Sequence, residues 1–375
     1  MGTPLRILAL EGYYGGSHRA FLDSVIAGSS HAWTVLSEPA SHWKWRMFHS
    51  SITLADKARA LVEAGEEFDV LLCGGMVNLA EFRAFAPADI SSLPSVLYVH
   101  ENQIAYPLRD GQKQDYRFGL IQLASALAAD RVWFNSEYNR ATMLDGLAAW
   151  FKTLPPAGMA AKLPLVRDRS EIVYPGVALP QVVARDGRTG PLHILWAHRW
   201  EYDKQPAVLL GALRELRRRG VEFRLSVIGE QFRTHPGEFE TIHAEFAEAI
   251  VRWGYQPTRE DYLAALAEAD VAVSTASHEF FGIGMVEAAG AGCAVALPDD
   301  LAYPDVFGRE ENPEWFYPSG EANALAKMLA GLSPETAAER GMAARRRVER
   351  YELAASVAAM DSKLLALAEM GTTHE

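Results

Sequence analysis

The chain has 375 residues, of which 49% are hydrophobic and 22% charged; this suits a globular protein with two domains and excludes a disordered or fibrous one. Its net charge of −12 argues against a general nucleic-acid binder. The charge is uneven, because residues 1–185 hold 17 basic and 18 acidic side chains, whereas residues 186–375 hold 19 and 30. The nearly neutral first half therefore leaves room for recognition of one specific RNA.

The two cysteines, Cys73 and Cys293, lack the spacing of metal ligands and lie in apolar surroundings. We expect both to be small buried residues of a protein in a reducing compartment. No segment approaches the roughly 20 apolar residues of a membrane span, and the start of the chain lacks a signal pattern. A cytoplasmic protein without a membrane partner is expected.

The first half alternates between strands and helices. Residues 5–10 (LRILAL) predict a buried strand, followed by the glycine-rich turn EGYYGGSH and by the helix RAFLDSVIAG, and apolar runs near residues 70–75, 95–102 and 131–137 follow the same plan. This alternation predicts a parallel sheet with helices on both faces, which binds ligands at the carboxyl ends of its strands. The residues expected at those ends are Gly15, Gly16, Asn78, His100, Glu101, Asn102, Asn135 and Ser136.

Each of these residues also has a structural interpretation. The glycine pair could form a plain turn between strand and helix. His18, just after it, could contact a ligand or cap the helix. Asn135 and Ser136 could line the acceptor side of the site or cap the next helix, since serine is a good cap. His100 could be a hydrogen-bonded structural histidine.

The segment SHWKWRMFHSS interleaves aromatic and basic residues. Aromatic side chains stack on unstacked bases and cations meet phosphates when proteins bind RNA loops. The candidate RNA-contacting residues are Trp43, Lys44, Trp45 and Arg46, together with Phe48, and the later Arg109, Lys113 and Arg117 could extend the same face. The alternatives are a core strand whose Lys and Arg reach to solvent, and a solvated helix face for the later cations.

A loop-rich segment at residues 184–192 coincides with the charge shift and predicts a domain boundary. We expect one domain over residues 1–185, a second over 190–350 and a C-terminal helix over 351–375. After the boundary the strand–helix alternation restarts. The fold class is therefore α/β, with two Rossmann-like doubly wound domains that face each other across a cleft, an architecture shared by sugar-nucleotide transferases, certain epimerases and phosphorylases.

In the second domain, Arg199 and Lys204 follow the strand HILWA. Two cations at a strand end would neutralise a diphosphate and stabilise it as it departs. The alternative is a solvated charged turn.

The segment SHEFFGIGMVEAAGAG places Glu279 and Glu287 eight positions apart, with Gly282 and Gly284 between them. On one continuous helix this spacing would span about 12 Å, more than the roughly 5–9.5 Å between the two carboxylates of a glycosidase. The glycines allow close approach of a ligand, and the helix start suits phosphate or sugar hydroxyls. The pattern favours a transferase in which Glu279 reaches a sugar and Glu287 a ribose, rather than two surface glutamates.

The combination of Arg-x4-Lys, SVIGE, WGY and E-F-F-G-x-G-x-x-x-E resembles the retaining glycosyltransferases of the GT-B fold with the Glu-x7-Glu motif. The resemblance implies that Arg199 and Lys204 bind the diphosphate of the sugar nucleotide, and that Glu287 binds its ribose. It further implies no metal cofactor, in agreement with the lack of an Asp-x-Asp motif. The remaining positions follow the same resemblance: the sugar meets Glu279, Phe281, Gly282, Ile283 and His100, the base lies near Gly229 and Tyr255, and the diphosphate lies near Gly15 and Gly16.

The first half resembles one narrower family, the tRNA-queuosine α-mannosyltransferases, through YGGSH, the WKWR cluster, HENQ-x-x-YP and FNS-x-x-N. This resemblance implies transfer of mannose from GDP-mannose to queuosine in the anticodon of tRNA-Asp. The acceptor side would then be formed by His18, Trp43, Lys44, Trp45, Arg46, Glu101, Asn102, Asn135 and Ser136.

The expected mechanism is front-face transfer, in which the leaving diphosphate takes the proton of the acceptor hydroxyl and the protein supplies positioning and charge. Two alternatives stay open. One is a GT-B enzyme that acts on a glycan, a lipid or a small molecule. The other is a module that binds a sugar nucleotide or RNA without turnover.

Overall fold

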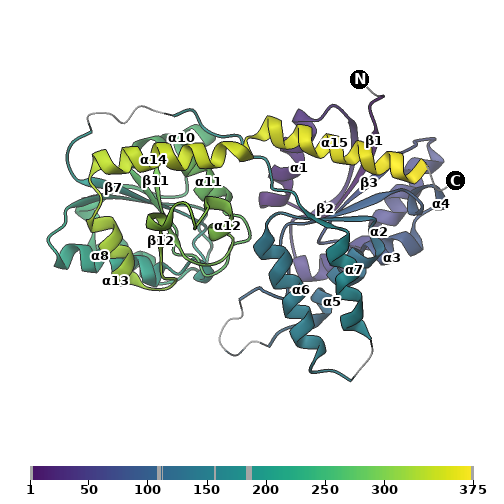
Figure 1. The fold of residues 1–375 in the computed structure, drawn as a ribbon, viewed down its shortest axis with the longest axis horizontal. Helices are drawn as coiled ribbons and strands as arrows, with labels where there is room; N and C mark the ends of the chain where they lie inside the picture. Colours follow the sequence, from purple (N-terminus) through teal and green to yellow (C-terminus); the bar gives the residue numbers. More distant parts are fainter. Residues whose placement is uncertain (1–2, 108–110, 112, 156–157, 183–187, 373–375) are drawn as a thin grey trace. The chain divides into compact units, whose positions relative to one another are not determined.

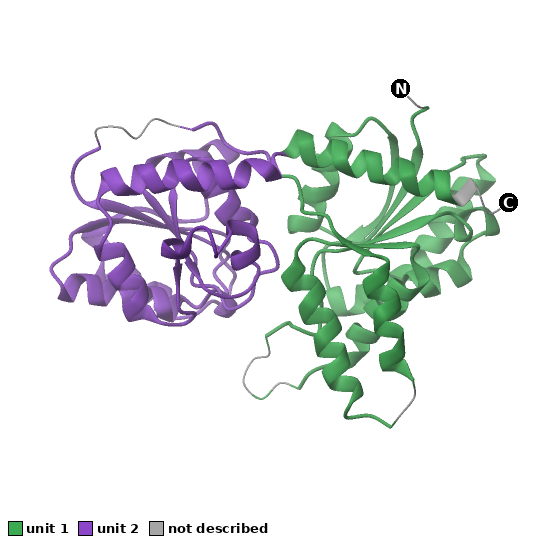
Figure 2. Ribbon diagram, in the orientation of Figure 1, with its two compact units in different colours: residues 1–176, 353–375 green, residues 177–352 purple. Residues whose placement is uncertain are grey.

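The computed structural model describes residues 3–107, 111, 113–155, 158–182 and 188–372, and it divides into two compact units. Figure 1 shows the helices and strands, and Figure 2 colours the units. Unit 1 comprises residues 1–176 and 353–375, and unit 2 comprises residues 177–352. The division thus lies before the predicted boundary near residue 185, and the C-terminal helix is part of unit 1 rather than a separate element.

Unit 1 contains a six-stranded parallel sheet with the strand order β2-β1-β3-β4-β5-β6. The strands are β1 (Arg6–Tyr14), β2 (Ala32–Pro39), β3 (Val70–Gly74), β4 (Ser95–Val99), β5 (Arg131–Phe134) and β6 (Ser170–Ile172). The expectation that the first strand ends at Leu10 is wrong. β1 stays paired with β2 as far as Tyr14, with an irregular register after Glu11, so that much of the predicted turn is strand.

The helices of unit 1 cover both faces of this sheet and form one apolar core on each face. Successive residues of β1 point alternately into these two cores. They are α1 (Gly16–Gly28), α2 (Trp43–Glu63), α3 (Leu79–Phe85), α4 (Ala88–Ser91), α5 (Tyr116–Ala128), α6 (Glu137–Phe151), α7 (Leu163–Asp168) and α15 (Leu353–Thr372). Leu8 and Leu10 join the core formed with α2, α3, α5, α6 and α7, whereas Ile7 and Ala9 join the core formed with α1 and α15.

The final helix, α15, joins unit 1 through apolar contacts and hydrogen bonds. Its buried residues Val357, Met360, Leu364 and Leu367 belong to the core that contains β1 and α1. The buried Asp361 accepts hydrogen bonds from the backbone and hydroxyl groups at Ser29 and Ser30, just after α1. These contacts explain why the helix belongs to unit 1.

Unit 2 contains a second six-stranded parallel sheet, with the order β12-β11-β10-β7-β8-β9. Its strands are β7 (Leu192–Ala197), β8 (Phe223–Ile228), β9 (Ile250–Gly254), β10 (Val271–Val273), β11 (Ala294–Pro298) and β12 (Phe316–Tyr317). Its helices are α8 (Pro206–Arg218), α9 (Glu238–Glu245), α10 (Arg259–Glu268), α11 (Ile283–Gly290), α12 (Tyr303–Phe307), α13 (Ala322–Ala330) and α14 (Pro334–Val348).

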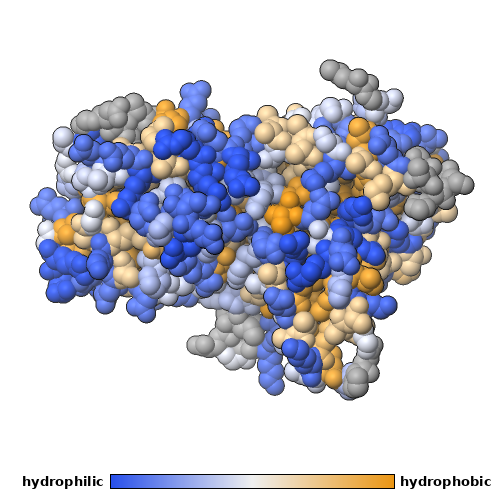
Figure 3. All heavy atoms as spheres, viewed as in Figure 1, coloured by the Kyte–Doolittle hydropathy of each residue, from blue (hydrophilic) through white to orange (hydrophobic). Residues whose placement is uncertain are grey.

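The surface and the cysteines agree with a globular protein. Among the described residues, none of the helices is both long and apolar enough to cross a membrane. The face in Figure 3 is largely hydrophilic with scattered apolar residues, an ordinary distribution. Cys73 and Cys293 are both buried and free, as predicted.

Candidate functional site

The strand order of unit 2 reverses direction between β7 and β10, which are neighbours in the sheet. From β7 the chain proceeds outward to β8 and β9, and from β10 it proceeds the other way to β11 and β12. Doubly wound sheets bind ligands at the carboxyl ends of the strands at such a reversal. The loops after β7 and β10 carry Arg199, Lys204 and Glu279, so the sheet brings these predicted residues to one place.

Lys204 is the centre of a buried ionic cluster at this reversal. Its Nζ atom donates a hydrogen bond of 2.7 Å to the backbone oxygen of His278, and it lies 3.2 Å from Asp203 and 3.5 Å from Glu279. The Lys204 side chain is only 7% exposed, so its charge needs these partners. The interpretation of this segment as a solvated turn is therefore wrong for Lys204.

The two ends of this cluster stabilise each other's charged forms. Burial disfavours the ammonium, but Glu279 and Asp203 raise the pKa of Lys204 above its ordinary value. Burial likewise disfavours the carboxylate, yet Lys204 lowers the pKa of Glu279. Both groups are therefore charged near neutral pH, and the Glu279 side chain keeps 25% exposure through which it could meet a ligand.

Arg199 lies in a different environment. Its side chain is 53% exposed and its guanidinium forms an ion pair of 3.1 Å with Glu201. An exposed guanidinium beside a buried lysine is suited to an anionic group that arrives from solvent.

Glu287 lies on α11, whereas Glu279 lies in the loop before it, so the two glutamates do not share a continuous helix and the 12 Å estimate does not apply. Both oxygens of Glu287 are engaged by α10: Arg259 donates to one at 2.5 Å and the hydroxyl of Tyr262 donates to the other at 2.8 Å. Sequence reasoning missed Arg259 and Tyr262, although their spacing of three residues places both on one helix face.

The glycines at the start of α11 have different roles. Gly282 caps the helix with φ +88°, and an added Cβ atom would lie 2.7 Å from the ring of Tyr303. Gly284 has ordinary helical geometry and an added Cβ atom would make only normal contacts. Phe281 is buried and Ile283 is the first helical residue. The first amides of a helix lack intrahelical acceptors and can face an anion or a hydroxyl.

Gly229 and Tyr255 follow β8 and β9, respectively. Gly229 has φ +146°, and an added Cβ atom would lie 1.8 Å from the backbone oxygen of His198, so packing alone requires glycine there. Tyr255 is 62% exposed. Their predicted place beside a base stays a prediction.

Sequence reasoning also missed His198, which directly precedes Arg199. Its Nε2 atom is buried and has no hydrogen-bond partner among the described residues. Burial, and then the charge of Lys204, lowers the pKa of His198 to about 4. The imidazole is therefore neutral near neutral pH and presents an unused polar atom close to the lysine cluster.

In unit 1, the predicted residues Gly15, Gly16, His18 and His100 gather at the carboxyl ends of β1 and β4. Gly15 is the N-cap of α1, and Gly16 has φ +53°. His18 is buried in the first turn of α1 and makes no capping bond, so the capping alternative is wrong. Its ring lies 4.4 Å from that of His100, measured between centroids.

Behind His18 lies Glu11, which sequence reasoning missed. Glu11 is 1% exposed, and its Oε2 atom lies 3.2 Å from Nδ1 of His18. With His100 these residues form the one group of three possible metal-ligating side chains within the described part of the chain, with ligand atoms within 4.8 Å of one another. Nδ1 of His18 lies within hydrogen-bond distance of Glu11, and the rings of His18 and His100 pack against each other.

The polar residues around His100 fix its loop. Asn135 donates to the backbone oxygen of His100 at 2.7 Å, and Ser136 caps α6 by accepting from the amide of Asn139, which confirms the capping alternative. The fully buried Asn102 donates a hydrogen bond to the side chain of Asn139 as well.

Glu101 is also predicted on the acceptor side. Its side chain accepts a hydrogen bond from the side chain of Gln103. These contacts give the four predicted residues a structural role.

From Trp43 onward the segment SHWKWRMFHSS forms the first part of α2, so the core-strand alternative is wrong. Trp45 is 62% exposed, and Phe48 is partly exposed beneath the guanidinium of Arg117, which lies 5.4 Å from the ring centroid. Lys44 is exposed and lies 5.5 Å from the ring of Trp43. We call these five residues the α2 aromatic patch. It offers both stacking surfaces and cations to solvent.

Arg46 does not belong to this patch. Its guanidinium pairs with Glu38 at 3.0 Å and donates to the backbone oxygen of Ser41 at 3.2 Å. These contacts give Arg46 a structural role at the start of α2, and its predicted contact with RNA stays a prediction. Arg109, predicted to extend the patch, lies outside the described residues.

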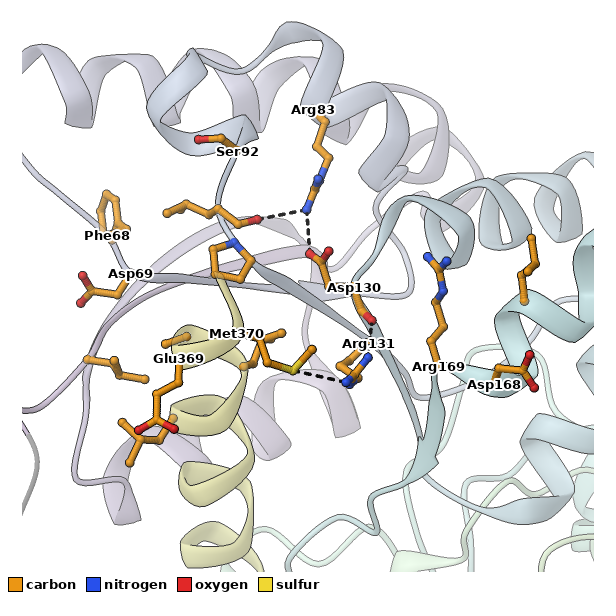
Figure 4. Close-up of a pocket in the computed structure, with 17 residues that line it drawn as sticks. Phe68, Asp69, Arg83, Ser92, Asp130, Arg131, Asp168, Arg169, Glu369 and Met370 are labelled. Atoms are coloured by element: carbon orange, nitrogen blue, oxygen red, sulfur yellow. Dashed lines mark hydrogen bonds and ion pairs between the residues drawn. The ribbon is translucent and has the colours of Figure 1, made fainter. Parts of the chain in front are cut away.

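A hollow of about 1130 Å³ lies at the opposite edge of the unit 1 sheet, near the starts of β3, β4 and β5 (Figure 4). Its cations are engaged locally: Arg83 donates to the backbone oxygen of Leu93 and pairs with Asp130, and Arg131 contacts the backbone of Asp130 and the sulfur of Met370. Parallel sheets bind ligands at the other edge, so we do not place the active site here.

Comparisons with known proteins agree with this geometry. Residues 6–177 match the family model described as tRNA-queuosine alpha-mannosyltransferase N-terminal, and residues 185–347 match glycosyl transferases group 1. The chain is 33% identical to the tRNA-queuosine alpha-mannosyltransferase of Drosophila melanogaster, over 86% of this chain and 85% of the relative. It is 24% identical to a glycogen synthase of Mycobacterium tuberculosis, over 74% and 72% of the two chains.

Among solved structures, the sucrose-phosphate synthase from Thermosynechococcus elongatus superposes with a TM-score of 0.72 at 15% identity, over 96% of this chain and 99% of that one. At this identity the likeness concerns the fold alone. Together with the two doubly wound sheets, it confirms the predicted α/β fold of the GT-B class.

Proposed function

Because the chain belongs to the tRNA-queuosine alpha-mannosyltransferase family and is a glycosyltransferase, we propose that it transfers mannose from GDP-mannose to queuosine in the anticodon of tRNA-Asp. The reaction would need no metal ion and would take place in the cytoplasm. The observation that carries the proposal is the buried Lys204–Glu279 pair, with Arg199 exposed beside it, at the reversal of the unit 2 sheet.

In the proposed mechanism, the bond between the anomeric carbon and the diphosphate oxygen breaks as the acceptor hydroxyl attacks the same face of the sugar. The proton of that hydroxyl passes to the departing diphosphate. Arg199 and Lys204 stabilise the negative charge on this leaving group. Glu279 and the first amides of α11 hold the sugar, and Glu287 holds the ribose. His100 keeps the contact with the transferred sugar that the family resemblance implies for it.

The acceptor side of the proposal is supported by the α2 aromatic patch. Base–aromatic stacking contributes about 1–3 kcal/mol per base, and Trp45 has its ring largely in solvent. Lys44 and Arg117 could meet phosphates next to the stacked base. The strongly acidic second half of the chain disfavours RNA, so contact with tRNA is assigned to unit 1.

The test is transfer of labelled sugar from GDP-mannose, and from UDP-sugars, to tRNA-Asp with and without queuosine, in buffer with and without EDTA. We expect label from GDP-mannose on the queuosine-containing tRNA alone, with EDTA making no difference. Consumption of the sugar nucleotide without label on either tRNA would reject the RNA acceptor and favour a glycan, lipid or small-molecule acceptor. Loss of transfer in EDTA would reject the metal-independent reaction.

The patch is tested by Trp45→Ala and Lys44→Ala. Loss of one stacked base should raise the KM for tRNA by about 5- to 150-fold in Trp45→Ala, with the KM for the sugar nucleotide unchanged. Phe85→Ala, which removes another exposed aromatic ring of unit 1, is the matched control. Equal KM values for tRNA in all three variants would remove the patch from the acceptor site.

A further inference from the structure

Glu11 is a buried carboxylate that the mechanism above does not use. It lies in β1 where the register with β2 becomes irregular, and it is 1% exposed. One oxygen accepts a hydrogen bond of 2.8 Å from the backbone amide of Tyr13, and the other lies 3.2 Å from Nδ1 of His18. A buried charge is costly unless it is paired, and an apolar pair of similar size usually packs at least as stably. Stability alone therefore explains this pair poorly.

His18 joins Glu11 to His100. Its Nδ1 atom faces the carboxylate, and its ring lies against the His100 ring, with 4.4 Å between centroids and 41° between planes. A ring nitrogen of His100 also lies within 4.8 Å of the ligand atoms of Glu11 and His18. Phe21 and Tyr98 hold the His100 ring from further sides, at 4.7 Å and 4.5 Å. The packed neighbours of His100 thus determine the orientation of its imidazole. Among them, His18 is the one that is itself held by a charged group, the Glu11 carboxylate.

We propose that Glu11 and His18 are positioning residues that fix the orientation of the His100 imidazole where it meets the transferred sugar. This inference rests on the proposed function, which gives His100 its contact with the sugar. Glu11 orients His18 through Nδ1, and His18 supports the face of the His100 ring. Groups in an active site must be held close to the productive geometry by packed and hydrogen-bonded neighbours, and a displacement of about 1 Å can lower the rate about 100-fold.

The charges around the three residues are consistent with this role. Burial disfavours the charged imidazole of His18, but Glu11 raises its pKa above the ordinary value. Burial, and then the charge of His18, keeps the pKa of His100 well below its ordinary value. A neutral His100 donates at one ring nitrogen and accepts at the other, which suits a sugar hydroxyl. The titratable groups that face the two rings are Glu11, Tyr13, Tyr98 and Glu101.

The test compares Glu11→Gln, which keeps the size of the side chain and removes its charge, with Asp270→Asn. Asp270 is a matched control because it is also a buried acid, it accepts a bond from the amide of the buried His193, and it lies in unit 2 before β10, at the other edge of that sheet. We expect both variants to be less stable. At a temperature where each is folded, only Glu11→Gln should lose kcat, by about 10- to 100-fold, with the KM for GDP-mannose changed less than about threefold.

Two further measurements separate a positioning role from a structural one. The pH profile of kcat in Glu11→Gln should shift to lower pH, because His18 loses the carboxylate that favours its proton. In ¹⁵N-histidine NMR spectra without substrate, the ring signals of His18 and His100 should change in Glu11→Gln and stay unchanged in Asp270→Asn. A folded Glu11→Gln enzyme with normal kcat and pH profile would overturn the proposal.

The remaining outcomes are also decisive. If the wild-type chain transfers no mannose, the proposed function fails, and the NMR spectra still report whether Glu11 controls both rings. An unchanged His100 signal in Glu11→Gln would overturn the positioning role by itself. Elemental analysis of the purified protein is the last control, since one metal ion per chain that disappears in Glu11→Gln would replace the positioning pair by a metal centre.

Discussion

At the scale of single residues, the two cations of the unit 2 site should respond differently to removal. Arg199 is 53% exposed, so Arg199→Ala should lower turnover about 100-fold and change the unfolding free energy by less than about 0.5 kcal/mol. Lys204→Met leaves Asp203 and Glu279 buried without their counter-charge, and should cost about 3–5 kcal/mol of stability in addition to activity. Kinetics combined with urea unfolding distinguishes the two. An Arg199→Ala enzyme with near-normal turnover would remove Arg199 from the site.

His198 predicts a pH dependence of stability. Its pKa is about 4 in the folded protein, against about 6.5 in an unfolded chain. Between these values the unfolded chain binds the proton and the folded chain does not, so stability is present above pH 6.5 and is lost as the pH falls toward 4. The loss from this group is ~3 kcal/mol when complete. Urea unfolding at pH 7 and pH 4.5 should show a smaller loss in His198→Gln than in the wild-type chain.

The control for this measurement is His243→Gln, which removes an exposed histidine of α9. If the two histidine variants and the wild-type chain lose the same stability between pH 7 and pH 4.5, the buried His198 does not account for the dependence.

Sequence patterns predicted the charged residues that the structure brings together in unit 2 better than the residues that surround His100. Arg199, Lys204 and Glu279 are charged residues at strand ends, and such residues can be recognised one by one. The place of Glu11 directly after the apolar run at residues 5–10 predicts a turn, whereas the structure buries it in β1 beside His18, a partner seven residues away that the sequence pattern does not reveal. The ion pair of Arg46 could not be predicted for a related reason, since its partner Glu38 lies on another element.

At the scale of elements, the start of α11 is constrained by one glycine and not by the other. Gly282→Ala places a side chain at φ +88° and within 2.7 Å of Tyr303, and should lower the unfolding free energy by about 1–3 kcal/mol. Gly284→Ala should leave stability unchanged or slightly raised, since alanine favours a helix. Thermal unfolding of the two variants tests this. Equal stability of both would show that the geometry at Gly282 is not required.

Element type followed from periodicity where a segment is long and clearly apolar on one side, as in β3, β4 and β7. The start of α2 was harder, because its aromatic residues Trp45 and Phe48 are exposed rather than buried. Their pattern could therefore be interpreted as a core strand. Only the continuation of the helix as far as Glu63, with Leu54, Ala55 and Ala58 in the core, decides the matter.

At the scale of the whole molecule, two doubly wound units could be predicted because the strand–helix alternation stops and restarts. The return of the last helix, α15, to unit 1 could not be predicted from the sequence. Its helical propensity is visible in the sequence, but its partners lie more than 300 residues earlier, at Ser29, Ser30 and the α1 core. Local patterns carry no information on such distant pairing.

This pairing leads to the final prediction. Leu364 on α15 is fully buried in the core that α15 shares with β1 and α1. Leu364→Ala should destabilise unit 1 by about 2–5 kcal/mol, through lost apolar burial and the cavity that remains. The structure assigns the helix to unit 1, so the loss should be confined to that unit. Hydrogen exchange should therefore increase in peptides from residues 1–176 and stay unchanged in peptides from residues 177–352.

Ala366→Ser on the exposed face of the same helix is the control, and it should leave exchange in both units unchanged. If peptides of unit 2 lose protection equally in Leu364→Ala, the two units unfold as one cooperative body. If neither unit changes, α15 is not part of the unit 1 core. The expected result, faster exchange in residues 1–176 alone, would mean that α15 supports the unit that contains His18 and His100, and not the unit that contains Lys204 and Glu279.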